Sequence, residues 1–195
     1  MPKRKKKNII STKNNYSILI TDINDLLESA RKYSARSVNS ILTAAYWFIG
    51  RRIVEYEYQG MDRSEYYGDK LLANLSIDLQ KKFGRGFSRP NLTLMKLFYQ
   101  EYPLEKICQT LSNESSGEVN IFQTLSAQSL LIELSNKLPL PWSQYVRLLS
   151  VKDENARKFY ESEVLRSGWS VRQLDRQISS QFYERTLLSK NKSVM

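Results

Sequence analysis

Residues 67–102 read YGDKLLANLSIDLQKKFGRGFSRPNLTLMKLFYQEY, and this stretch decides the fold that the chain is expected to adopt. Apolar residues recur every three or four positions in both halves, which is the pattern of two amphipathic helices. Gly84 and Gly86 separate the halves, and glycine suits the left-handed conformation in which many helices end. Ser88 is placed to cap the second helix, and Pro90 lies in its first turn. The stretch therefore predicts a helix, a tight turn and a second helix.

Two interpretations of this helical pair are open. In a helix-turn-helix that binds DNA, the second helix lies in the major groove. A helical hairpin that serves only packing has the same pattern, so the pattern alone does not separate the two. The charges favour DNA, because no acidic residue falls between Gln80 and Gln100.

Seven polar residues at the turn and on the second helix are candidates for DNA contact. They are Lys81, Lys82, Arg85, Ser88, Arg89, Asn91 and Lys96. Arg and Asn side chains form paired hydrogen bonds with base edges, so Arg89 and Asn91, together with Lys96, are expected to face the DNA. The cations nearer the turn are expected to hold phosphates.

The basic charge of the chain is unevenly distributed. The formal net charge is +10, and residues 1–15 contain six basic residues and no acidic one. We expect these residues to form a disordered basic tail that can bind phosphates non-specifically. The net charge therefore overstates the case for a DNA-binding surface on the folded part.

The rest of the pattern predicts an all-α fold. Alternating apolar and polar runs are rare, and helical spacings extend over most of residues 16–188. We expect one multi-helix domain there that contains the helix-turn-helix, with helices at 16–33 and 34–58. Residues 112–120 (SNESSGEVN) are expected to form a loop, where a short wing is also compatible, and residues 189–195 a C-terminal linker.

Composition excludes several kinds of chemistry. The chain has no histidine, and Cys108 is its only cysteine, so His-based catalysis, internal disulfides and Cys clusters for zinc are ruled out. We expect no metal and no cofactor. The apolar run around 41–50 is too short to span a bilayer, and the basic start lacks an apolar signal segment, so a cytoplasmic location without membrane contact is expected. Glu161 and Glu163 are expected to be solvated and ion-paired rather than catalytic.

Several short motifs occur in an order that is typical of one bacterial family. They are WFIGRRI (47–53), YG (67–68), LSxxL (75–79), FGxGFS (83–88), NLxxM (91–95), PWSxY (141–145), RxFY (157–160), WSVRxLxRQI (169–178) and YER (183–185). On these motifs the chain resembles the N-terminal domain of YhcG-type proteins, over roughly residues 34–185. One departure is Gln144, where that family usually has a histidine.

The resemblance implies a DNA-binding helical domain that precedes a nuclease domain of the PD-(D/E)xK type. The catalytic residues of the family lie in that later domain, and this chain ends where it would begin. No Asp or Glu here has a lysine at the second position after it, as such a nuclease site requires. The expectation is therefore a DNA-binding module with no enzymatic activity of its own.

A protein-interaction module is the alternative function. Aromatic and basic residues gather in the second half of the chain, and aromatic residues are enriched at interfaces. The secondary candidates are Trp142, Gln144, Arg147, Trp169, Arg172 and Arg176. The expected partners are DNA and either a second copy of the chain or a nuclease partner. Filling of the core by the aromatic rings is the competing interpretation.

Overall fold

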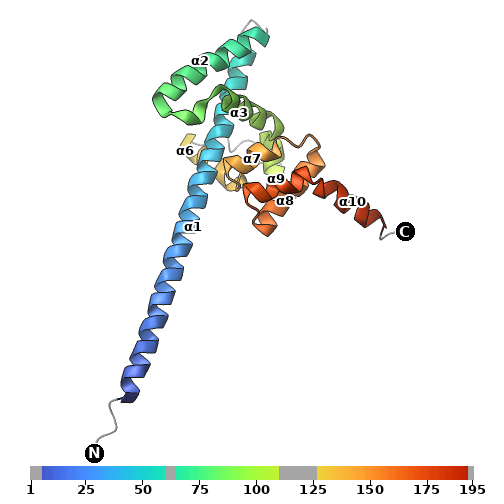
Figure 1. Ribbon diagram of the computed structural model, residues 1–195. Helices are drawn as coiled ribbons and strands as arrows, with labels where there is room; N and C mark the ends of the chain where they lie inside the picture. Colours follow the sequence, from blue (N-terminus) through green and yellow to red (C-terminus); the bar gives the residue numbers. More distant parts are fainter. Residues whose placement is uncertain (1–5, 60–64, 110–126, 193–195) are drawn as a thin grey trace, which may run out of the picture. The chain divides into compact units, whose positions relative to one another are not determined.

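The computed structural model describes residues 6–59, 65–109 and 127–192, and all regular structure in them is helical (Figure 1). The expected all-α fold is thus confirmed. The helices are α1 (Lys6–Gln59), α2 (Glu65–Phe83), α3 (Arg89–Glu101), α4 (Leu104–Gln109), α6 (Ala127–Lys137), α7 (Trp142–Leu148), α8 (Glu154–Ser167), α9 (Val171–Ser179) and α10 (Phe182–Lys192), with a 3₁₀ turn η1 (Arg85–Phe87). That α2, η1 and α3 form a DNA-binding helix-turn-helix remains a prediction.

The chain divides into two compact units, residues 1–38 and residues 39–195. Helix α1 begins at Lys6, inside the stretch expected to be a tail, and continues through the break expected between residues 33 and 34. The physical reason is that this stretch has no proline, and its only glycine is Gly50, so nothing in it stops a helix. Helix α10 likewise extends to Lys192, into the expected linker. The expected loop 112–120 lies outside the described residues.

The core of the second unit is built mostly from large aromatic and aliphatic side chains. Trp47 of α1, Phe98 of α3, Tyr145 of α7 and Tyr160 of α8 are all buried in one cluster. The indole Nε1 of Trp47 donates to the Tyr102 carbonyl at 2.8 Å, so even this ring leaves no polar atom unpaired. These side chains bring α1, α3, α7 and α8 together around one core.

A second, smaller cluster joins α1, α2 and α3. It consists of Ile53, Leu72, Leu92 and Met95, all buried. The cluster fixes the two helices of the opening stretch against α1, and it confirms that their apolar stripes face inward. Phe83, the apolar residue at which α2 ends, is instead exposed.

The turn between α2 and α3 follows the expected local chemistry with one difference. Gly84 has a φ of 89°, in the left-handed region that glycine favours. Ser88 is the N-cap of α3, and Pro90 lies in its first turn. The Ser88 side chain, however, makes no capping hydrogen bond. The expected cap position is right, and the expected capping bond is absent.

Candidate nucleic-acid interface

Three exposed cations gather where α2 meets η1. Lys81 and Lys82 are in the last turn of α2, and Arg85 begins η1. Among the described residues, no carboxylate lies within ion-pair distance of any of the three, and the Lys82 ammonium lies 5.2 Å from the centre of the Phe83 ring. We name Lys81, Lys82 and Arg85 the turn cluster. Within the described ranges, the three charges therefore lack a carboxylate partner and can meet an anionic ligand.

Arg89 is near the turn cluster in sequence but is held differently. Its Nη2 lies 2.8 Å from Oδ1 of Asp69 on α2. Both side chains are more than half exposed, at 52% and 63%, so the pair is a surface ion pair of little net strength. An anion that approaches α3 could therefore replace Asp69 as the partner of Arg89.

Asn91 and Lys96, both expected to face DNA, use polar atoms in contacts within the protein. The Asn91 amide donates to the Gly86 carbonyl, and its oxygen accepts from the Trp142 indole at 2.9 Å. The Lys96 ammonium lies 2.6 Å from Oε2 of Glu57, in a largely buried pair. These contacts tie α3 to η1, α7 and α1. Half-buried Ser88 also lies outside the turn cluster.

Among the secondary candidates, Gln144 is buried, and Trp142 and Trp169 are partly buried and packed against the core. The Trp142 ring packs edge-on against Phe98, with 5.4 Å between ring centres. Gln144 is buried, and its Nε2 donates to the Trp169 carbonyl at 2.6 Å. Trp169 itself packs against the Phe182 ring. For Trp142 and Trp169, the contacts agree with the packing interpretation.

The three arginines of the secondary set remain at the surface. Arg147 of α7 lies 3.3 Å from Asp175 of α9, and both side chains are half exposed. Arg172 and Arg176 are exposed and four residues apart, so they share one face of α9. The structure does not place these arginines in contact with the turn cluster.

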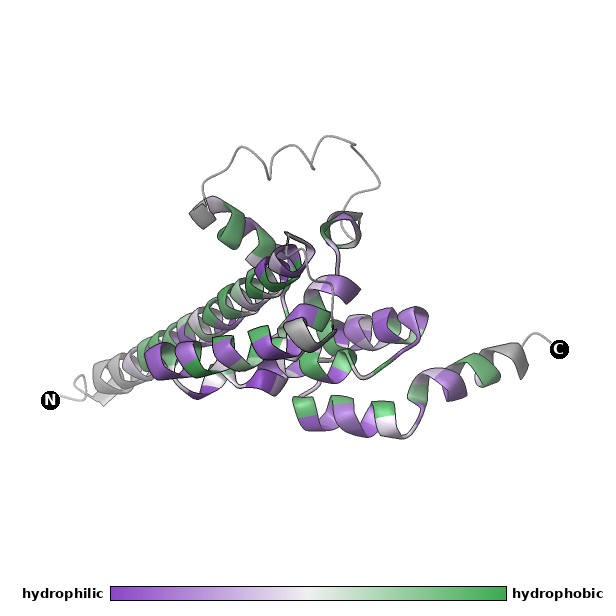
Figure 2. Ribbon diagram, turned by 90° about the horizontal axis from the view of Figure 1, so that it is seen from above, coloured by the Kyte–Doolittle hydropathy of each residue, from purple (hydrophilic) through white to green (hydrophobic). Residues whose placement is uncertain are grey.

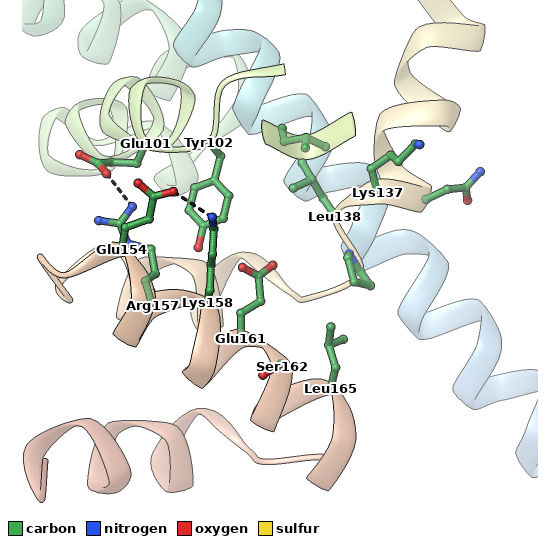
Figure 3. Close-up of a pocket in the computed structure, with 13 residues that line it drawn as sticks. Glu101, Tyr102, Lys137, Leu138, Glu154, Arg157, Lys158, Glu161, Ser162 and Leu165 are labelled. Carbon is green, nitrogen blue, oxygen red and sulfur yellow. Dashed lines mark hydrogen bonds and ion pairs between the residues drawn. The ribbon is translucent and has the colours of Figure 1, made fainter. Parts of the chain in front are cut away.

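A cavity of about 320 Å³, which no sequence pattern predicted, lies beside α8. Figure 3 shows Glu101, Glu154, Arg157 and Lys158 on one side, with Lys137, Leu138 and Leu165 on the other. Glu161 points into the cavity and accepts from the Tyr145 hydroxyl at 3.2 Å. The expectation that Glu161 is a solvated ion-paired residue is therefore wrong, because the tyrosine and the cavity wall shield it. The matching expectation for Glu163 is right only in part: Oε1 of that residue lies 2.7 Å from Arg166, but only 12% of its side chain is exposed.

Burial raises the pKa of the Glu161 carboxyl above its usual value, and the Tyr145 hydrogen bond and the Arg157 charge only partly oppose this. A raised folded-state pKa means that the folded protein holds the proton more tightly than the unfolded chain. The stabilisation is thus complete below about pH 4.5 and is lost as the pH rises through the folded-state pKa. Burial also raises the pKa of the Tyr145 phenol.

We therefore expect Glu161→Gln to remove part of the fall in the free energy of unfolding as the pH rises above about 4.5. The measurement is urea unfolding followed by circular dichroism at several pH values between 4 and 8. Glu154→Gln is the control, because 46% of that side chain is exposed and its carboxylate pairs with exposed Lys158 on the same helix. Equal pH slopes for the Glu161 variant and the unaltered protein would contradict the assignment.

Within the three described ranges, no group of three acidic or cysteine side chains is arranged to hold a metal ion. No helix in the part of the chain that the structure describes combines the length and apolar character needed to cross a membrane.

The fold and the turn cluster define the class of protein, an all-α multi-helix domain with exposed cations at the turn between α2 and α3. Residues 22–185 match the DUF1016 N-terminal domain, and the chain belongs to this family. A relative from Escherichia coli (strain K12), named "Putative nuclease YhcG", is 52% identical over 182 residues. That match covers 87% of this chain and 46% of the relative, so the chain spans less than half the length of this curated protein. No solved structure matches.

These comparisons confirm the resemblance to YhcG-type proteins and correct one expectation. The chain was expected to have no enzymatic activity, because no assembled nuclease site is visible in its sequence. A relative at 52% identity carries the name of a nuclease, which points to an enzyme family. The absence of a local site within one segment does not place the protein outside that family.

Proposed function

We propose that this domain binds DNA for a nuclease-family protein, and that the turn cluster holds the phosphate backbone. The single observation that carries the proposal is the set of three exposed cations, Lys81, Lys82 and Arg85, with no carboxylate partner among the described residues. Unpaired cations at one turn are suited to phosphates, because neutralising each phosphate releases bound counterions. Family membership supports a nucleic acid as the anionic partner.

The contacts favour backbone binding over the reading of base sequence. Base readout needs donors and acceptors that are free to meet base edges. Asn91 and Lys96 were expected to face the DNA from α3, and each already makes at least one polar contact within the protein. Arg89 is the third residue expected to face the DNA, and its exposed ion pair with Asp69 is weak enough for DNA to replace Asp69 as its partner. We infer binding that depends on charge and salt, with little sequence preference.

The test is a charge-neutralising variant of the turn cluster, Lys81→Gln/Lys82→Gln/Arg85→Gln. We expect its slope of log affinity against log salt to be smaller by about 2–3, since each phosphate contact contributes about 0.9 for duplex DNA. At one fixed salt concentration near 0.1 M, the affinity should fall at least about tenfold. Fluorescence anisotropy with a labelled duplex at several salt concentrations measures both quantities.

A matched control removes the same charge from elsewhere. Lys152→Gln/Lys158→Gln/Arg166→Gln changes three exposed cations at and near α8 and should leave the salt slope of the domain almost unchanged. Both triple variants are also compared in chains that lack residues 1–15, so that the basic start of the chain does not mask the result. Equal losses in the two triple variants would show that only net charge matters and would refute the proposed site.

A further inference from the structure

The first compact unit carries a stripe of apolar side chains that face solvent. Helical spacing places Tyr16, Leu19, Ile20, Ile23, Leu26, Leu27 and Val38 on one side of α1, and each is between 40% and 69% exposed. In Figure 2 the colours of apolar residues recur along α1 among polar ones. The described part of this unit contains a single helix, so the unit itself provides nothing that covers the stripe. A helix of this kind is normally stabilised by burying such a face.

The stripe follows a heptad pattern. Positions 16, 20, 23, 27, 30, 34 and 37 alternate spacings of four and three, as in the seam of a two-helix coiled coil. Most of the charged side chains project away from this seam: Asp22, Asp25, Glu28, Lys32 and Arg36, while Arg31 flanks it. The pattern therefore fits a second helix laid along α1.

Charge and size both divide the seam into two unlike halves. Residues 16–30 contain three acidic residues and no basic one, whereas residues 31–38 contain three basic residues and no acidic one. The first half of the seam carries large residues such as Ile20, Ile23 and Leu27. The second half carries Ala30, Ser34 and Ser37.

We propose that the occupant of this stripe is a second copy of the chain, whose α1 is aligned in the antiparallel direction about a two-fold axis between Glu28 and Ser29. This register places Leu27 opposite Ala30 of the partner subunit, Ile23 opposite the partner's Ser34 and Ile20 opposite the partner's Ser37. Three large seam residues thus each meet a small one, Tyr16 lies opposite the partner's Ile41 at the end of the seam, and the acidic half of each helix lies along the basic half of the other.

A parallel alignment of the two α1 helices fits worse, both in charge and in the size of the paired side chains. Parallel pairing would set acidic against acidic and basic against basic within the distance over which charges interact at physiological salt. It would also place large residues together at one end and small ones together at the other, which leaves gaps in the seam. The antiparallel register is also symmetric, since each residue pair occurs twice, as a two-fold interface between identical chains requires.

The first arm of the test is the oligomeric state of the full chain by analytical ultracentrifugation over a concentration series. We expect a dimer, and we expect Ile23→Asp/Leu27→Asp to raise its dissociation constant by about 100-fold or more, because each of four apolar side chains loses its burial. The control Thr21→Asp/Ser29→Asp adds the same charge on the polar side of the helix and should remain dimeric. Circular dichroism verifies that both variants stay folded.

The second arm determines direction and register by disulfide trapping in a Cys108→Ser background. A mixture of Ile20→Cys and Ser37→Cys chains should form a mixed disulfide, because the two positions face each other in the proposed register. Ile20→Cys alone should not link to itself, since antiparallel helices hold these two positions about 25 Å apart along the axis. A monomer at all concentrations, a dimer that survives Ile23→Asp/Leu27→Asp, or efficient Ile20→Cys self-linkage would each overturn the proposal.

Discussion

Gly50→Ala is expected to lower the free energy of unfolding by about 3 kcal/mol or more, above the usual range for overpacking a core. A Cβ atom at position 50 would lie 2.0 Å from the carbonyl oxygen of Met95 and 2.7 Å from its carbonyl carbon. Both atoms belong to the backbone of α3, so no side-chain rotation relieves the clash. Helices α1 and α3 would have to move apart, which opens the cluster that contains Ile53 and Leu92.

The loss would appear despite an opposing local effect. Alanine favours a helix over glycine by about 1 kcal/mol, so in an uncrowded helix the same change would stabilise. Gly86→Ala is the matched control, because the nearest atom to its new Cβ would be the Tyr46 hydroxyl oxygen at 3.9 Å, an ordinary contact. We expect a change within about 0.5 kcal/mol there. Urea unfolding followed by circular dichroism measures both, and equal stabilities would contradict the close contact of α1 with α3.

The behaviour of these glycines shows which parts of the fold local sequence can predict. Gly84 was expected to end a helix because φ above zero is a property of one residue and its neighbours, and the structure agrees. The role of Gly50 depends on a carbonyl in another helix, which no local pattern reveals. The expected break near residue 34 was wrong because serines weaken a helical pattern without stopping it, while no proline or glycine does so there.

The residues of the candidate interface also differ in whether local sequence or a distant contact decides their role. The turn cluster was predictable because exposed lysines and arginines follow from helical spacing and from the absence of nearby acids. The engagement of Asn91 was not, because its indole partner Trp142 is 51 residues away in sequence. The shielding of Glu161 was equally hidden, since it depends on Tyr145 of another helix. The sequence alone does not distinguish a polar residue that binds a ligand from one that makes a contact inside the protein.

Arg157→Met is expected to destabilise the protein by about 3 kcal/mol, near the lower end of the range for breaking a buried ion pair. Only 7% of the Arg157 side chain is exposed, and its Nη1 lies 2.5 Å from Oε2 of Glu101. Its Nε and Nη2 both donate to the Val151 carbonyl, at 3.1 and 2.9 Å. Removing the guanidinium leaves that carbonyl and the carboxylate without these partners. Water can partly replace them, since Glu101 remains 39% exposed, and this places the loss at the lower end.

The next residue of the same helix provides the control. Lys158 pairs with Glu154 at 3.0 Å, but 66% of its side chain is exposed, so the pair is screened by solvent. Lys158→Met removes one cation from α8 just as Arg157→Met does, and we expect a change of at most about 0.5 kcal/mol. Comparing the two variants by urea unfolding therefore separates burial from charge. Similar losses in both would show that Arg157 acts through the charge of the helix, and that its contacts with Glu101 and Val151 contribute little.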